Sequence, residues 1–138
     1  MKVSDYMTKD VVTANLRDGL RQTHERMHER LIRHMPVLGD DGKLAGIITD
    51  RDIRRPDFVD TNPDKVDVYA IDDAHTVQQA MSGNPHTVHA NDDIRAALNE
   101  FLGKGFGALP VVDDHGNVVG LLSAYDLLRA FKDVLNAG

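Results

Sequence analysis

The sequence predicts an α+β fold built from two similar halves. Three observations carry the prediction: a gapless internal repeat, strand-type and helix-type runs in the same order in both copies, and a glycine-containing turn in each copy. Residues 3 to 55 align with residues 77 to 129, and identities are several-fold more frequent than the roughly three that chance would give. The identical pairs are Val3/Val77, Met7/Met81, Thr13/Thr87, Asp18/Asp92, Arg21/Arg95, Pro36/Pro110, Val37/Val111, Asp40/Asp114, Gly42/Gly116, Gly46/Gly120, Asp52/Asp126 and Arg55/Arg129.

Each copy begins with a short helical lead, followed by a strand and a helix. In copy one, residues 11–13 predict a brief strand, and in both copies apolar residues then recur at near-helical spacing. These residues are Leu16, Leu20, Met27 and Leu31 in copy one, and Ile94, Ala97, Leu98 and Phe101 in copy two. Because a unit of about 50 residues buries little core alone, we expect the two copies to share a core and to form a seam.

A hairpin and a second helix complete each copy. Apolar runs at 35–38 and 44–48 flank Asp41-Gly42, and runs at 109–112 and 118–122 flank His115-Gly116. Two β-rich runs around such a turn predict a hairpin. Each copy is thus expected to be β-α-β-β-α, with too few strands for a doubly wound sheet.

The segment between the copies predicts a linker. It contains Pro56 and Pro63 and few apolar residues, although residues 64–70 allow a short amphipathic helix. We therefore divide the chain into motif 1 (residues 1–58), a linker (59–74) and motif 2 (75–138).

Composition restricts the classes of function. The chain has 138 residues, a formal charge of -6 and a pI near 5.5, which argue against nucleic acid or an anionic membrane as the main partner. It contains no cysteine, no apolar stretch long enough to span a membrane and no apolar core of a signal peptide. We expect one compact cytoplasmic module, and no catalytic cofactor.

A motif that can bind a ligand follows each hairpin. Residues 46–52 and 120–126 share glycine, two aliphatic residues, a hydroxyl residue, two free positions and aspartate. Thr49 with Asp52, and Ser123 with Asp126, predict capping boxes, which need no ligand. Glycine inside a strand indicates that something approaches the backbone closely, which favours a ligand. A helix start with a hydroxyl and a carboxylate can hold a phosphate and a ribose diol.

These doubled motifs resemble one known family. The leading residues 3–7, the strand beginning Arg33-His34-Met35-Pro36, the Asp-Asp-Gly-Lys turn and residues 46–52 are similar to the cystathionine-β-synthase (CBS) domain pair, or Bateman module. The resemblance covers about residues 1 to 133. It implies two pseudo-symmetric motifs packed through their sheets, adenosine-nucleotide clefts at their seam, and disc-like homodimers.

The resemblance also implies binding roles for matching residues. Asp52 and Asp126 would bind the ribose hydroxyls, and Thr49 and Ser123 would reach ribose or phosphate. The backbone of the first strand would read the adenine edge, and the second strand would wall the base pocket. The first-strand positions are Val12, Thr13, His86 and Thr87, and the second-strand positions are Met35, Pro36 and Pro110.

The copies differ at the positions that would meet phosphates. Arg33, His34 and Arg51 of copy one are replaced by Gly107, Ala108 and Tyr125 in copy two. We therefore expect copy one's side chains to bind most of the anionic end of a ligand. We also expect one competent site, with the other weak or empty. A solvated or salt-bridged surface remains the alternative interpretation of the basic residues in copy one.

A different motif favours metal chemistry. His24-Glu25-Arg26-Met27-His28 matches H-E-x-x-H of zinc hydrolases, with His34 at the place of a third ligand. Two observations oppose it: Leu31 stands where that class needs a helix-breaking glycine, and copy two has Leu98 and Leu102 at the histidine positions.

The sequence thus predicts a non-enzymatic sensor. It would bind AMP, ADP, ATP, NAD or S-adenosylmethionine and signal to a protein partner in trans, as a homodimer. A scaffolding homodimer with vestigial clefts is the alternative, and a zinc hydrolase is the remote one.

Overall fold

The computed structural model describes residues 1–55, 59–60 and 70–138, and these form two compact units. Residues 12–84 form the copy-one unit, which holds the first hairpin. Residues 1–11 and 85–138 form the copy-two unit, which holds the second hairpin. None of the described helices is both long enough and apolar enough to cross a membrane.

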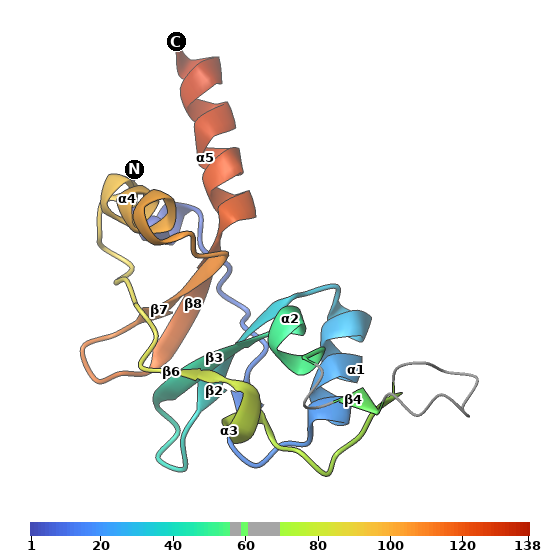
Figure 1. The fold of residues 1–138 in the computed structure, drawn as a ribbon. Helices are drawn as coiled ribbons and strands as arrows, with labels where there is room; N and C mark the ends of the chain where they lie inside the picture. Colours follow the sequence, from blue (N-terminus) through green and yellow to red (C-terminus); the bar gives the residue numbers. More distant parts are fainter. Residues whose placement is uncertain (56–58, 61–69) are drawn as a thin grey trace. The chain divides into compact units, whose positions relative to one another are not determined.

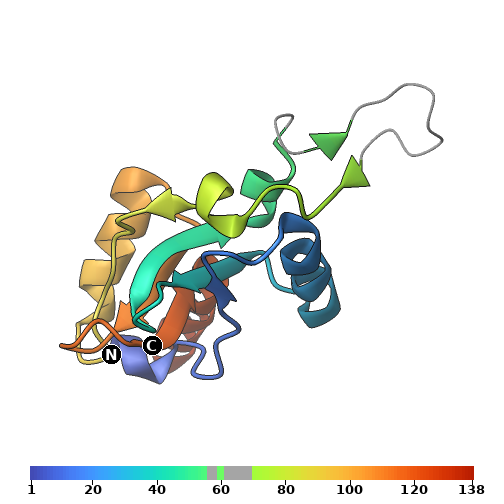
Figure 2. The same cartoon turned by 90° about the horizontal axis from the view of Figure 1, so that it is seen from below.

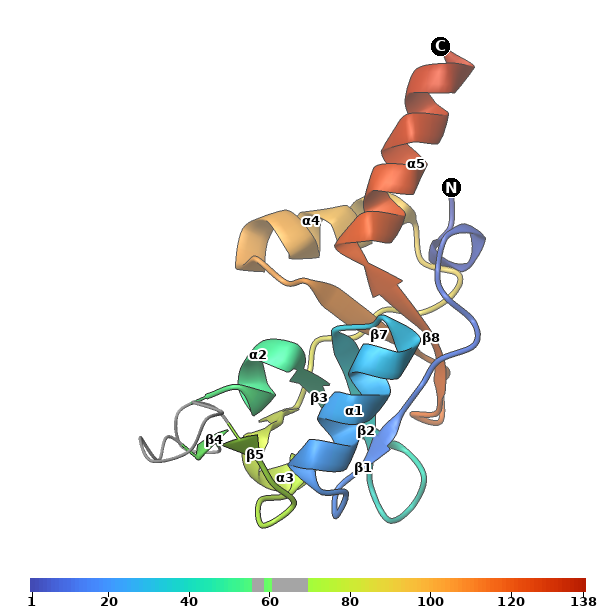
Figure 3. The same cartoon turned by 90° about the vertical axis from the view of Figure 1, so that its right-hand side faces the viewer.

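The copy-one unit is a helix-covered sheet (Figures 1 and 3). Its sheet has the order β1-β2-β3-β6, with β1 parallel to β2 and the other pairs antiparallel. A second small pair is formed by β4 and β5. The elements are β1 (Ala14–Asn15), α1 (Leu20–Arg30), β2 (His34–Leu38), β3 (Leu44–Thr49), α2 (Asp50–Ile53), β4 (Val59–Asp60), β5 (Ala70–Ile71), α3 (Val77–Ala80) and β6 (Ser82–Gly83).

Alternating burial explains why this unit folds. Leu20 and Met27 of α1 face the sheet, where they meet Met35 and Val37 of β2 and Ile48 of β3. All five side chains are at most 2% exposed. The 3.6-residue period of the helix and the two-residue period of β3 thus bring their apolar faces together in one core.

The copy-two unit repeats this plan. Its hairpin is covered by α4 and followed by α5, which continues well beyond β8 in Figure 1. Val88 replaces the first strand with a single parallel bridge to Val111, at the positions equivalent to Ala14 and Val37. The elements are the 3-10 helix η1 (Val3–Asp5), α4 (Ile94–Lys104), β7 (Ala108–Val112), β8 (Val118–Ser123) and α5 (Ala124–Ala137).

The lead of each sequence copy packs on the other copy's hairpin. Thr8, which directly follows the lead of copy one (residues 3–7), forms an antiparallel bridge with Leu121 of β8. Ser82 and Gly83, which follow the lead of copy two, form β6 along β3 (Figure 2). The compact units therefore exchange their leads relative to the sequence repeats.

This exchange explains the two strand glycines. A Cβ on Gly46 would lie 2.6 Å from the Ser82 carbonyl oxygen, and a Cβ on Gly120 would lie 2.6 Å from the sulfur of Met7. What approaches each glycine is therefore the exchanged lead, so the glycines by themselves give no support to a ligand.

The predicted α+β class is confirmed, with local corrections. The first strand begins at Ala14 rather than at residues 11–13, and Leu16 precedes α1. The order β-α-β-β-α is present in the copy-one unit. The predicted helix at 64–70 falls largely outside the described residues, and Ala70 itself begins β5. Packing of the two motifs through their sheets stays a prediction.

Candidate functional site

Both predicted capping boxes are present at the ends of the hairpins. In the copy-one unit, the Thr49 amide donates to Asp52 Oδ2 at 2.9 Å, and the Asp52 amide donates to Thr49 Oγ1 at 3.1 Å. In the copy-two unit, the corresponding distances between Ser123 and Asp126 are 2.9 and 3.2 Å. Each aspartate thus uses one carboxylate oxygen to hold the start of a helix.

The second carboxylate oxygen differs between the units. Asp126 Oδ1 lies 3.3 Å from Nη1 of Arg129, and the Asp126 residue is only 4% exposed. Asp52 is half-buried, and within the described ranges no hydrogen-bond donor or cation pairs with its Oδ1. Only the copy-one carboxylate therefore keeps an oxygen available to a ligand hydroxyl.

Helix length produces this difference. Arg55 and Arg129 occupy equivalent positions, three residues after the aspartate. Because α5 runs from Ala124 to Ala137, Arg129 lies one turn beyond Asp126 on the same face. In contrast, α2 ends at Ile53, and Arg55 precedes a proline in the sequence, which disfavours a helical backbone at Arg55.

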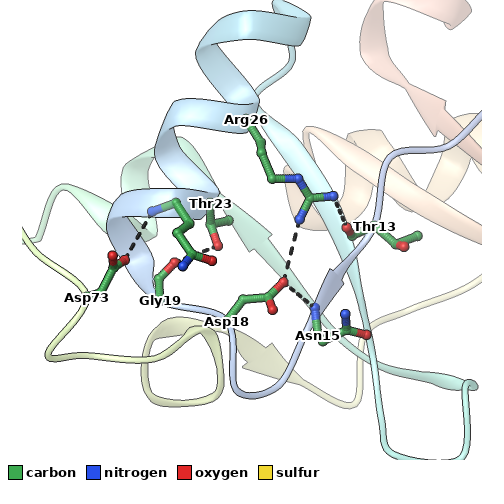
Figure 4. A network of polar contacts seen from close by, with 8 residues as sticks. Thr13, Asn15, Asp18, Gly19, Thr23, Arg26 and Asp73 are labelled. Atoms are coloured by element: carbon green, nitrogen blue, oxygen red, sulfur yellow. Dashed lines mark hydrogen bonds and ion pairs between the residues drawn. The ribbon is translucent and has the colours of Figure 1, made fainter.

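The backbone before β1 is held by Arg26. Its Nη2 donates to the Thr13 carbonyl oxygen at 2.6 Å, and its Nη1 lies 3.5 Å from Asp18 Oδ2 (Figure 4). The same Asp18 oxygen accepts from the Asn15 amide at 2.9 Å. Thr13 therefore has a fixed backbone, as a residue that reads a base edge through main-chain atoms would need.

We use "first-strand corner" for the region where the segment before the first strand meets the helix that follows it. In the copy-two unit this corner carries an acidic residue in place of the arginine. Glu100 takes the place of Arg26, and its Oε2 lies 3.5 Å from Nδ1 of His86. This oxygen is buried and accepts no hydrogen bond, since its contact with His86 does not have hydrogen-bond geometry. The ring of His86 lies 5.0 Å from that of Phe106 between centroids, tilted by 40°, and Nε2 of His86 lies 3.5 Å from the Lys104 amine. The two first-strand corners are thus chemically different.

His34 and Arg33 occupy the start of β2. His34 pairs with Thr49 across the hairpin, and the Arg33 carbonyl oxygen accepts from the Asp50 amide at 2.9 Å. Burial lowers the pKa of His34, with a further reduction from Arg33, while the negative charge of Asp52 acts in the opposite direction. His34 is therefore neutral at neutral pH, which leaves Arg33 and Arg51 as the cations predicted to meet phosphate.

The remaining predicted residues divide by exposure. Met35, Pro36 and Pro110 are buried in their strands, and Met35 belongs to the copy-one core. Val12 packs at the edge of the same core. In contrast, Arg51, His86 and Thr87 are exposed.

The H-E-x-x-H segment forms no metal centre in the described ranges. His24 lies 3.3 Å from Asp50 Oδ1, and Glu25 pairs with Arg21 at 3.3 Å. No group of three or more potential ligands occurs among the residues that the structure places. The objection based on Leu31 was wrong in its premise, because Leu31 ends α1 with a left-handed φ of 55° without being glycine.

A polar pocket of about 360 Å³ lies beside this helix. His24, His28, Arg33 and Asp50 line it together with apolar residues. Arg33 therefore borders the same pocket as two histidines of α1.

Sequence reasoning missed Arg26 and Arg129. The aligned repeat places Glu100 at the position of Arg26, and this reversal of charge could have predicted that the two first-strand corners differ. The Arg55/Arg129 identity was also visible, but its meaning depends on where each helix ends.

Comparison with known proteins identifies the family. The CBS domain model matches residues 3–56 and 77–133, which together make up most of the chain. The chain belongs to the CBS domain family. A CBS domain-containing protein of Dictyostelium discoideum is 31% identical over 137 residues, covering 96% of this chain and 92% of the relative.

Solved CBS domain pairs share the fold. A CBS domain pair in complex with 5′-methylthioadenosine and S-adenosyl-L-methionine is 25% identical, with a TM-score of 0.77 over 96% of this chain and 97% of that one. A structure of CBSX2 in complex with AMP is 24% identical, with a TM-score of 0.79 over 96% and 97%. These neighbours confirm the tandem CBS arrangement.

Some relatives are much longer. A homoserine O-acetyltransferase of Methanohalobium evestigatum is 25% identical over 131 residues, but the chain spans only 24% of its length. The catalytic name of that relative therefore describes a protein of which this CBS pair matches about a quarter.

Proposed function

We propose that this CBS domain pair is a regulatory module that binds an adenosine-containing ligand. Support comes from the family and from a 25% identical CBS domain pair that holds 5′-methylthioadenosine and S-adenosyl-L-methionine. AMP, ADP, ATP and NAD share the adenosine part and are the other candidates.

The observation that carries the proposal is the open carboxylate of Asp52. It lies beside the Thr49 hydroxyl and keeps one oxygen unpaired among the described residues. A ribose diol donates two O–H groups, which a carboxylate accepts with charge-assisted hydrogen bonds. Thr13, whose backbone Arg26 fixes, is proposed to read the base, and Arg33 and Arg51 to attract phosphate.

Regulation follows from differential binding. A ligand shifts the arrangement of the two units only as far as its affinity differs between their arrangements. We propose that a protein partner in trans reads this shift.

The first experiment is calorimetric titration of the nucleotide-stripped protein. AMP, ATP, NAD and S-adenosylmethionine are titrated separately into the wild type and into Asp52→Asn, which keeps an oxygen to accept from the Thr49 amide but loses the charge. We expect saturable binding of at least one compound and a loss of about 100-fold in affinity in Asp52→Asn. Asp41→Asn, in the hairpin turn, is the control that should bind normally. Failure of all four compounds to bind would overturn the proposal.

The copy-two unit also presents an apolar face, which favours self-association. We use "apolar face" for Leu98 and Leu102 of α4 and Leu128, Phe131, Val134 and Leu135 of α5. Their exposed fractions range from 41% for Leu98 to 78% for Leu102. Beside them lies a groove of about 400 Å³, lined mainly by apolar side chains. Such a contiguous patch indicates an interaction surface.

We propose that the apolar face binds the same face of a second copy. Each of its six large apolar side chains is at least 41% exposed, and the buried centre of a stable interface is enriched in apolar side chains. The equivalent residues on α1, His24 and His28, are polar, so a pairing of unlike faces would bury histidines against leucines. Like faces are therefore the better match.

Light scattering coupled to gel filtration tests this association. Wild type is expected to be a dimer and Phe131→Asp a monomer, because the carboxylate would be buried without a partner. Lys132→Glu, an exposed position on the same helix, is the control expected to stay dimeric. A monomeric wild type at about 50 μM would overturn the interface, since stable dimers of this size have dissociation constants well below that.

A further inference from the structure

Asp52 and Asp126, the two aspartates predicted to bind ribose, differ in one contact. Their shared sequence motif does not predict this difference. Asp126 is paired with Arg129, and Asp52 has no such pair in the part of the chain that the structure describes. Since both units carry the same capping box, this contact distinguishes the two aspartates.

We propose that the guanidinium of Arg129 competes with a ligand for the Asp126 carboxylate, a role that we call a guard. An adenosine ligand would then bind through Asp52 and leave the copy-two site empty. This inference rests on the proposed function, and it adds to it the stoichiometry and the residue that sets it.

The chemistry of the pair supports a guard. Asp126 Oδ2 is committed to the Ser123 amide at 2.9 Å, and the Arg129 guanidinium lies 3.3 Å from Oδ1. A ribose diol would have to share or displace this cation at an aspartate whose side chain is 5% exposed. The guanidinium cannot be deprotonated in proteins, so no ordinary pH removes the competitor.

Arg129 itself is placed so that it can act and be tested. Its side chain is 53% exposed, so its removal leaves no cavity in the core. Helix α5 continues for eleven residues after Asp126. This helix holds Arg129 one turn away from the Asp126 carboxylate.

The copy-one unit provides the internal control. Arg55 is the equivalent arginine, but α2 ends two residues before it, and among the described residues the exposed Arg55 forms no hydrogen bond or ion pair with Asp52. Instead, the neighbouring Arg54 pairs with Asp50 at 2.9 Å. The same residue type in the same sequence position is thus a guard in one unit and not in the other.

The surroundings of the two sites act in the same direction. The copy-two corner places Glu100 where the copy-one corner has Arg26, and Gly107 and Tyr125 where it has Arg33 and Arg51. The copy-two unit thus lacks three cations that the copy-one unit offers to a phosphate at the equivalent positions.

Calorimetric titration of the nucleotide-stripped full chain with AMP and with S-adenosylmethionine tests the guard. Wild type is expected to bind one ligand per chain, with binding lost in Asp52→Ala and kept in Asp126→Ala. Arg129→Ala should add a second binding event, at least about 10-fold tighter than any weak second event in wild type. Arg55→Ala is the matched control and should leave the stoichiometry at one. The double variant Arg129→Ala/Asp126→Ala should lose the added event.

The failures of the two proposals differ. Two equal sites in wild type, or a single event lost in Asp126→Ala, would overturn the guard while leaving the binding function intact. An Arg129→Ala protein with unchanged melting temperature and still one site would also overturn it. Absence of binding in every variant, wild type included, would instead remove the binding function itself, and the guard with it.

Discussion

The two units carry the same capping box but continue it differently. After Asp52, α2 ends within one residue, at Ile53, whereas after Asp126 the helix α5 continues to Ala137. As a result, the arginine shared by both copies contacts its aspartate only in the copy-two unit. Equal residues at equal positions therefore do not make equal sites, because the secondary structure that follows decides which side chains meet.

The helices that precede the hairpins differ at their C-termini in a similar way. Gly105 ends α4 with a φ of 69°, and Leu31 ends α1 with a φ of 55°. Glycine adopts this left-handed conformation without steric cost, and leucine does not. One repeat thus stores backbone strain that the other avoids.

The largest effect is expected from filling the strand glycines. Gly46→Ala should destabilise the protein by about 3 kcal/mol, because its Cβ would meet a backbone oxygen that moves only with β6. Gly120→Ala should cost about 1.5 kcal/mol, since its shortest contact is to the flexible side chain of Met7. Urea unfolding of both variants measures the difference. Equal losses would show that the exchanged leads pack alike.

The next effect compares the two carboxylates. Asp126→Ala should lower the free energy of unfolding by about 2 kcal/mol, because it removes a helix cap and leaves Arg129 without its partner. Asp52→Ala should cost about 1 kcal/mol, the value of a cap alone. Thermal and urea melts without ligand provide the measurement. A greater loss for Asp52→Ala would contradict the comparison.

A smaller and opposite effect is expected at the helix ends. Leu31→Gly should stabilise the protein by about 0.5 kcal/mol, since the relief of left-handed strain exceeds the entropy that glycine adds to the unfolded chain. Leu31 is 89% exposed, so little packing is lost. Gly105→Leu is the reciprocal variant and should destabilise by about 1 kcal/mol. If Leu31→Gly is less stable than wild type, Leu31 makes a contact that outweighs its strain.

The smallest effect concerns pH. Burial lowers the pKa of His34 in the folded protein below its ordinary value of 6.5, so the unfolded chain takes up a proton first as pH falls. The stability contributed by neutral His34 is therefore present above pH 6.5 and is lost as pH falls toward the folded pKa. His34→Gln should lose less stability between pH 7.5 and pH 5 than wild type, whereas His89→Gln, at an exposed position, should follow wild type. Parallel curves for wild type and His34→Gln would contradict this assignment.

Much of the fold could be predicted because its signals are local. The hairpins, the capping boxes and α4 follow from turn residues, cap residues and apolar periodicity. The first strand was misplaced because its pairing with β2 depends on a parallel partner more than twenty residues away. The exchange of the leads was not predicted, since a repeat in sequence carries no information about which copy each lead contacts.

The candidate site was predictable in its residue types but not in their contacts. Sequence reasoning selected Asp52 and Asp126 as equals, and the structure distinguishes them through Arg129. It also treated His34 as a cation, although burial beside Arg33 keeps the imidazole neutral. Both differences arise from side-chain neighbours that tertiary structure supplies.

The exchanged leads also determine the order in which parts of the protein can fold during synthesis. Thr8 is synthesised more than 100 residues before its bridge partner Leu121. At ~5–20 residues per second, the lead waits roughly 5 to 20 s for its strand. The copy-one unit, which is complete once Asn84 has emerged, can fold during that interval. The lead with the adjoining Thr8 can therefore join its unit only after the copy-one unit, which follows it in the sequence, has been completed.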